Sequence, residues 1–164
     1  MVKQEHGWIG VNTARTNRLI REALEQGIID DFGEIGGIRQ EVIVSAESRL
    51  DFLLETVQGS VYLEVKHCSL AEEGIALFPD AVTARGAKHL HELAALVETN
   101  HRAAVLFCVQ RLDAVCCRPA AGIDPVYAKT VAWAHARGVR FLAYQADVQP
   151  DAITIKGSIP FFPV

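Results

Sequence analysis

The sequence of 164 residues has no apolar run long enough to cross a bilayer, because the longest one extends only from Ala103 to Val109 and a helical span needs about 20 residues. The stretch from Met1 to Gly10 has no hydrophobic segment of the kind found in a secretory signal peptide. The four cysteines form no Cys-x-x-Cys pair, which favours buried reduced thiols over a zinc site or disulfides. These absences predict a soluble, cytoplasmic protein with no membrane contact.

A surplus of basic residues is missing as well. Lys and Arg number 16 against 20 Asp and Glu, for a formal net charge of −4, and the isoelectric point is near 5.8. Since nucleic-acid-binding domains usually carry a basic excess, any contact with DNA must be local. A bound magnesium ion would reverse the field around carboxylates that otherwise repel DNA.

The apolar residues, 50% of the chain, suffice for the core of one domain over residues 1–164. Periodicity and capping residues predict helices over residues 12–27, from the cap Asp80 to about Thr99, and from the cap Asp124 to Arg137. Strands are expected over 38–44, 49–55, 61–67, 103–109, 114–118, 139–144 and 153–155. The second and third strands form a hairpin, and the fifth pairs with the wholly apolar fourth. The predicted fold class is α/β, with a mixed central sheet flanked by helices.

Acidic and basic side chains meet on two of these strands. Alternation places Glu64 and Lys66 on one face of their strand, about 7 Å apart, and the hairpin brings Asp51 of the preceding strand toward Glu64. Asp51 lies between apolar residues, and two neighbouring carboxylates repel unless a proton or a divalent cation lies between them. The three residues suit magnesium-assisted attack of water on a phosphodiester, with the Lys66 ammonium positioning the nucleophile or stabilising developing charge.

The residues alone leave plainer interpretations open. Glu-x-Lys is common on solvated strand faces, and Asp51 can pair with Arg49 or Arg39 instead of binding a metal ion. The acids and the lysine can also form an internally satisfied salt-bridge network in a protein-interaction domain. The histidines show no metal-ligand spacing on one face, because His89 and His91 point about 200° apart on a helix, so surface or core positions are favoured for them.

Longer segments resemble the sugar fermentation stimulation protein A family. They are Ser48-Arg-Leu-Asp-Phe52, Leu63-Glu-Val-Lys66, Leu77–Leu90 and Leu142-Ala-Tyr144, and the match covers nearly the whole chain. The resemblance implies a restriction-endonuclease-like fold of the PD-(D/E)xK nuclease type, DNA binding, and a link to the regulation of sugar-utilisation genes. Family members usually carry a small β-barrel domain of the OB type before this segment, for which this chain has no room.

By this resemblance, Asp51 is the first acid of the nuclease motif, Glu64 the second and Lys66 the lysine, and these three are the predicted catalytic residues. The resemblance also suggests Glu22 as an extra acid on a helix. Leu50 stands where the motif name has a proline. The predicted ligands of Mg²⁺ or Mn²⁺ are Asp51, Glu64 and Glu22, and the predicted DNA contacts are Arg15, Arg18, Arg49 and Arg85.

The site residues and the resemblance together predict a DNA-binding protein that is a magnesium-dependent phosphodiesterase. The alternative is a non-catalytic DNA-binding regulator of sugar genes, of the maltose type, on the same fold. The salt-bridge network in a protein-interaction domain is the third hypothesis. Association of identical copies is left open by the sequence.

Overall fold

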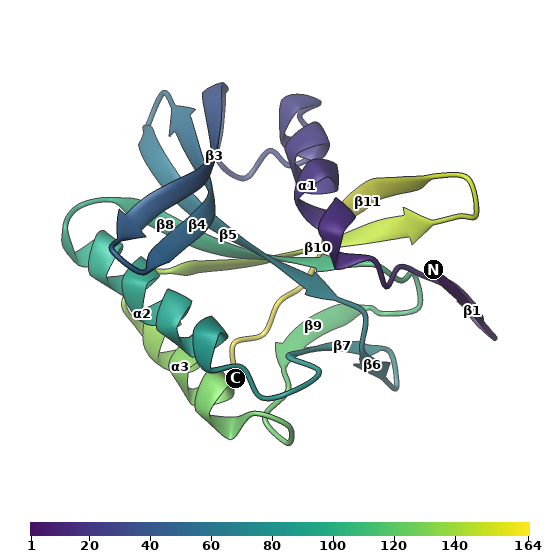
Figure 1. The fold of residues 1–164 in the computed structure, drawn as a ribbon. Helices are drawn as coiled ribbons and strands as arrows, with labels where there is room; N and C mark the ends of the chain where they lie inside the picture. Colours follow the sequence, from purple (N-terminus) through teal and green to yellow (C-terminus); the bar gives the residue numbers. More distant parts are fainter.

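A six-stranded mixed sheet organises the chain in the computed structural model, which describes residues 1–164 (Figure 1). Its strands lie in the order β11-β10-β8-β5-β4-β3. Neighbours are antiparallel except for β5 with β8 and β8 with β10, which are parallel. The strand bounds are β3 Ile35–Ser45, β4 Ser48–Thr56, β5 Gly59–Cys68, β8 Arg102–Val109, β10 Arg140–Val148 and β11 Ile153–Ile159.

Helices cover both faces of this sheet, α1 on one and α2 with α3 on the other (Figure 1). Their bounds are α1 Thr16–Glu25, α2 Ala84–Glu98 and α3 Pro125–Ala136, and a short 3₁₀ turn over Thr13–Arg15 precedes α1. The parallel connections β5 to β8 and β8 to β10 run through α2 and α3, as parallel pairing requires. None of the three helices combines the length and the apolar character that a membrane span requires.

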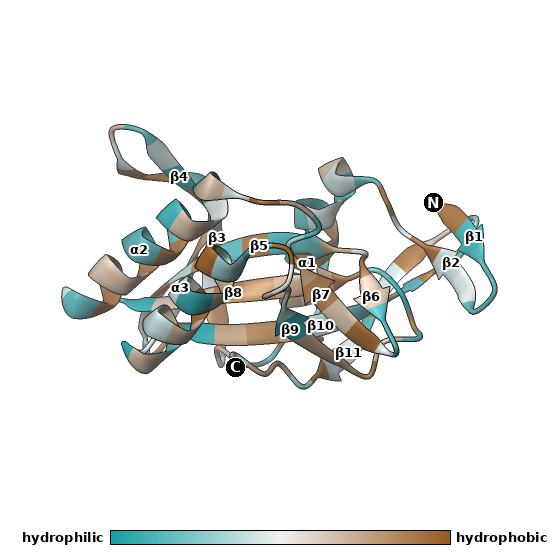
Figure 2. Cartoon of the chain, turned by 90° about the horizontal axis from the view of Figure 1, so that it is seen from below, coloured by the Kyte–Doolittle hydropathy of each residue, from teal (hydrophilic) through white to brown (hydrophobic).

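The central strand β8 explains why two cores form. Its alternate residues divide between the two sheet faces, with Leu106 packing in the α1 core and Phe107 in the α2 and α3 core. Figure 2 shows this strand largely in the colours of apolar residues, whereas α2 carries hydrophilic residues along its length. A strand buried on both faces needs the uninterrupted apolar run that the sequence has here.

The predicted helices and the six main strands are present, but the start of α2 differs from the prediction. Thr83, not Asp80, caps this helix, because Thr83 Oγ1 accepts a hydrogen bond from the Gly86 amide at 3.0 Å. Thr83 is held in an extended conformation by Asp124, whose Oδ2 accepts from the Thr83 amide at 2.8 Å. Asp80 lies exposed before the helix. The N-cap of α2 therefore depends on the contact between Thr83 and Asp124, which are 41 positions apart in the sequence.

The predicted pairing of the 114–118 strand with the 103–109 strand is wrong. Strand β9, Cys116–Pro119, instead pairs in parallel with β7, Ile75–Phe78, in a small sheet of order β6-β7-β9. The reason is that β8 already has β5 and β10 as neighbours, so it offers no free edge. The other short strands, β6 Ala71–Glu72 and the hairpin β1 Val2–Gln4 with β2 Gly7–Ile9, have no counterpart in the prediction.

Candidate active site

The β4–β5 ladder ends beside Asp51, and this end forms the site. The last paired residues are Phe52 and Leu63. Beyond them the Val65 amide donates to Asp51 Oδ2 at 2.8 Å, so a side-chain carboxylate replaces the next acceptor of the ladder. From α1, Asn17 Nδ2 donates to the other oxygen, Oδ1, at 2.8 Å. Both oxygens of Asp51 are therefore held where the two strands separate.

Glu64 is buried next to Asp51 and accepts hydrogen bonds from two donors. Its Oε1 accepts from Lys66 Nζ at 2.7 Å and from His89 Nδ1 at 2.6 Å. Burial alone raises the pKa of Glu64, but the hydrogen bond from His89 and the charge of Lys66 outweigh it, so the pKa lies below its ordinary value. Glu64 is thus held in its ionised form in an interior position.

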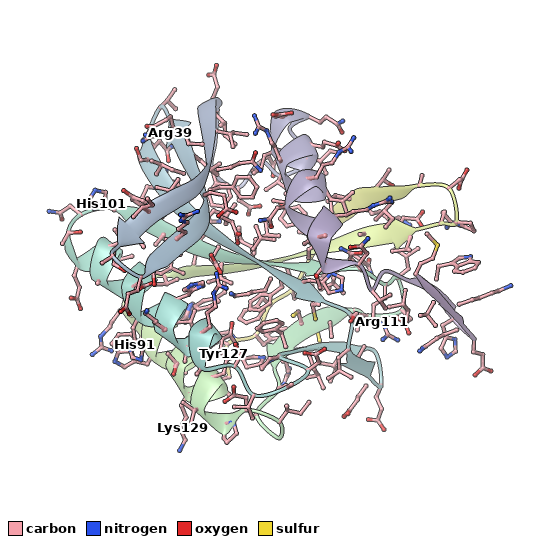
Figure 3. The ribbon with its side chains drawn as sticks, viewed as in Figure 1. Arg39, His91, His101, Arg111, Tyr127 and Lys129 are labelled. Atoms are coloured by element: carbon pink, nitrogen blue, oxygen red, sulfur yellow. The ribbon has the colours of Figure 1, made fainter.

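Asp51 has the opposite electrostatic balance. Burial and the negative charge of Glu64 raise its pKa from 3.8 to about 6, although the Val65 amide and Asn17 oppose the shift. Neither Arg39 nor Arg49 neutralises it, since Arg39 pairs with Glu55 at 3.4 Å (Figure 3) and Arg49 makes no contact with Asp51. The interpretation of Asp51 as a simple arginine ion pair is therefore not supported. Two close carboxylates, of which Asp51 has a raised pKa, form a site where a cation would be favourable.

Comparison with known proteins decides the family. The family model described as "Sugar fermentation stimulation protein RE domain" matches residues 14–152. A sugar fermentation stimulation protein homolog of Desulfotalea psychrophila is 46% identical over 155 residues, covering 94% of this chain and 66% of that protein. The homolog of Citrifermentans bemidjiense is 44% identical over 160 residues, covering 98% of this chain and 69% of that protein.

The chain belongs to the sugar fermentation stimulation protein family. It spans about two thirds of the length of these curated relatives. The solved structure of Pyrococcus furiosus SfsA in complex with Ca²⁺ matches with a TM-score of 0.91 at 24% identity, covering 98% of this chain and 69% of that chain. The prediction of a mixed α/β, restriction-endonuclease-like fold of this family is confirmed.

Glu22 does not join the two acids in this family member. It accepts from Arg18 Nε at 2.9 Å and lines a separate groove of about 290 Å³ with Asp151 of the β10–β11 connection. Asn17 lies beside Asp51 instead. It stands five residues before Glu22 on α1, so the two side chains point about 140° apart around the helix. No group of three or more His, Cys, Asp or Glu side chains in the chain is arranged to hold a metal ion.

The four predicted DNA-contacting arginines divide into two sets. Arg49 and Arg85 line one groove of about 700 Å³ between the β3–β4 turn and α2. His89 also lines this groove, so its basic wall borders Glu64. Arg15 and Arg18 instead line the groove that contains Glu22, at the side of α1 that faces β11. Only Arg49 and Arg85 thus line the groove that His89, the partner of Glu64, also lines.

Two side chains of the site, Asn17 and His89, were not assigned to it from the sequence. His89 is the partner of Glu64 and only 3% exposed. A signal was available, because His89 lies on the same helix stripe as Leu93 and a buried polar group needs a partner. Asn17 lies within residues 14–152 that the family model matches, but no sequence rule connects it with Asp51, 34 positions later.

Proposed function

We propose that this chain is a divalent-metal-dependent phosphodiesterase acting on DNA, with Asp51, Glu64 and Lys66 as its catalytic residues. The observation that supports it best is that the carboxylates of Asp51 and Glu64, on adjacent strands, lie next to each other and face inward. The Lys66 ammonium lies 2.7 Å from Glu64 Oε1. A mere surface pattern would be solvated, whereas Glu64 is 4% exposed. Burying two acids together costs stability, which is expected where function requires them.

The residues present fit a hard cation. Asp51 and Glu64 supply carboxylate oxygens, the ligands that Mg²⁺ and Mn²⁺ prefer. The raised pKa of Asp51 reflects its burial and, second, repulsion by Glu64, and a cation would relieve this repulsion. The solved Pyrococcus furiosus protein is in complex with Ca²⁺, another oxygen-seeking divalent ion, and this supports the assignment. When bound, such an ion neutralises phosphate charge and lowers the pKa of water.

Lys66 provides the third function. One N–H of its ammonium is committed to Glu64 Oε1, which leaves two donors. Its side chain is 14% exposed, so these donors can reach a phosphate oxygen or an attacking water while the apolar stem stays buried. The compact charge of lysine suits this role, because it stabilises negative charge that develops on the reacting phosphate.

Three basic side chains in one groove, Arg49, Arg85 and Lys88, support DNA binding by an acidic chain, although Glu41 and Glu47 line the same groove. Arg49 and Arg85 are exposed in the groove that His89 also lines, and exposed arginines of this kind can neutralise backbone phosphates. Lys88 also lines this groove, although it is paired with Glu47 at 3.3 Å. We therefore propose that the DNA backbone lies along this groove, with Arg15 and Arg18 as more distant contacts.

The second candidate is a DNA-binding regulator of sugar-utilisation genes that does not cut. It is favoured because no three His, Cys, Asp or Glu side chains are arranged together to hold a metal ion, since a relic site would lose a ligand without losing the fold. In that case the acids bind an ion structurally or serve only as a buried network with Lys66 and His89.

Calorimetric titration of Mg²⁺ and Mn²⁺ separates these functions. The wild type and Asp51→Ala are titrated, and the same samples are assayed for cleavage of plasmid and single-stranded DNA. Metal binding that is lost in Asp51→Ala, together with metal-dependent cutting, supports the phosphodiesterase. Binding without cutting supports the regulator, and no binding reduces the three residues to a structural network.

Lys66→Ala tests the mechanism. We expect cutting to be lost while the fold and metal affinity are kept, because Glu64 retains the His89 hydrogen bond. Lys156→Ala, which removes an exposed lysine of β11, is the matched control and should cut like the wild type. Unchanged cutting by Lys66→Ala would refute the catalytic role of Lys66.

A further inference from the structure

His89 stands out among the buried polar residues because its partner is Glu64. It projects from α2 toward the sheet, is 3% exposed, and its Nδ1 lies 2.6 Å from Glu64 Oε1. A carboxylate only accepts hydrogen bonds, so His89 donates through Nδ1. Hydrogen bonds to a charged acceptor are about twice as strong as neutral ones.

The two donors to Glu64 Oε1 are not equivalent. Lys66 comes from the same strand, two residues away, on a flexible four-carbon stem, and in the proposed mechanism its free donors serve the substrate. His89 comes from a helix, 25 positions later, and a short ring offers few alternative positions. When Lys66 turns toward the substrate, His89 is the group that continues to hold Glu64.

The first turn of α2 is packed closely enough to fix the imidazole. At Gly86, three residues before His89, an added Cβ would lie 2.8 Å from the Thr83 side chain and 3.1 Å from the Tyr127 ring of α3 (Figure 3). On the next turn Leu90 and Leu93 are fully buried in the core. A donor on an element with this packing keeps its position better than one on a loop.

We propose that His89 is a positioning residue that holds the Glu64 carboxylate toward Asp51 and so sets the affinity of the site for a divalent metal ion. This proposal rests on the proposed function, since it assumes that Glu64 binds the ion. Asp51 has corresponding support from Asn17 and the Val65 amide. Each acid is thereby oriented by a helix on a different face of the sheet, and such supporting contacts change metal affinity by about 10 to 100-fold in other sites.

Three variants at one position test the proposal. His89→Asn keeps an N–H donor close to the place of Nδ1, His89→Gln keeps an amide but moves it to the place of Nε2, and His89→Leu removes the donor. His91→Leu is the matched control, because His91 is exposed on the same helix and lies against Trp133 (Figure 3). Calorimetry with Mg²⁺ and Mn²⁺ is the main measurement, and thermal unfolding in EDTA shows which variants are folded.

We expect His89→Gln and His89→Leu to bind the ion about tenfold or more weakly, with His89→Asn and His91→Leu close to the wild type. A purely structural role would lower the unfolding temperature in EDTA without this pattern of loss and rescue. If His89→Leu fails to fold, the metal affinities of His89→Gln and His89→Asn still test the proposal. Equal affinity of His89→Gln and the wild type overturns this proposal alone, whereas a wild type that binds no divalent ion overturns it together with the proposed function.

Discussion

At the scale of single residues, Asp51 costs the fold stability when it is ionised. Burial and the charge of Glu64 raise its pKa from 3.8 to about 6. Between these values the folded protein binds the proton more tightly than the unfolded chain does, so stability falls as the pH rises from about 4 to about 6 and stays lower above that range. A neutral amide of similar shape avoids this cost, since its oxygen can still accept from the Val65 amide while Asn17 turns its own amide oxygen toward the new N–H group.

We therefore expect Asp51→Asn to raise the free energy of unfolding at pH 8 by about 1 to 3 kcal/mol in EDTA, since a shift of one pKa unit corresponds to about 1.4 kcal/mol. The difference should shrink toward zero near pH 4, where Asp51 of the folded wild type is protonated. Urea unfolding between pH 4 and pH 8 measures it, with Asp151→Asn at an exposed position as the control. A variant that is less stable than the wild type at pH 8 would contradict this electrostatic account.

The sequence identified the acids of the site but not the groups that orient them. Asp51, Glu64 and Lys66 could be predicted because strand alternation and a hairpin are local rules, and the structure does bring the three together. Asn17 and His89 reach them across 34 and 25 positions, from helices whose placement depends on the packing of the whole sheet. Glu22 is the converse case, since its helix was predicted but the direction of its side chain, which pairs with Arg18 away from Asp51, was not.

At the scale of elements, one aspartate connects the starts of two helices. Asp124 Oδ1 accepts from the Tyr127 amide at 2.9 Å and caps α3, as predicted, while its Oδ2 accepts from the Thr83 amide at 2.8 Å. Thr83 in turn caps α2, the helix that carries His89. Because local rules rank Asp above Thr at a cap, the sequence favours Asp80, and the choice of Thr83 follows only from its contact with Asp124.

Replacing Asp124 should therefore cost more than the loss of an ordinary cap. We expect Asp124→Ala to lower the free energy of unfolding by about 2 to 4 kcal/mol, because it removes one cap and leaves the half-buried Thr83 amide without its acceptor. Asp80→Ala should change it by less than about 0.5 kcal/mol, as for an exposed residue outside a helix. Chemical denaturation of the two variants measures both values, and equal losses would show that Asp80 caps α2 after all.

At the scale of the whole molecule, the site lies where the layered architecture opens. The two cores lie on opposite faces of the sheet, and strands β4 and β5 separate at Asp51, so helices from both layers reach the same pair of acids. The acids are thus placed at the end of a ladder whose other residues are closely packed. Closely packed surroundings that hold the charged side chains in place are what a preorganised metal site needs.

Because the chain has a net charge of −4, the salt dependence of DNA binding tests whether DNA contacts only a local basic patch. If DNA contacts only the wall of Arg49, Arg85 and Lys88, about three phosphates are neutralised, and the logarithm of the binding constant should fall with the logarithm of the salt concentration with a slope of about −3. Arg85→Ala should reduce the steepness by about one. Fluorescence anisotropy with a labelled duplex at a fixed Ca²⁺ concentration measures the slope.

Arg137→Ala is the control for this measurement, because Arg137 stacks on Trp133 at the far end of α3 and lies outside the groove. It should leave the slope unchanged, since a general loss of one positive charge alters the mean field of the protein but releases no counterion from the DNA. A slope that falls equally in both variants would mean that overall charge governs the interaction. A slope reduced only by Arg85→Ala places the DNA backbone along the wall beside Glu64, where an acidic protein can approach DNA only through a local patch.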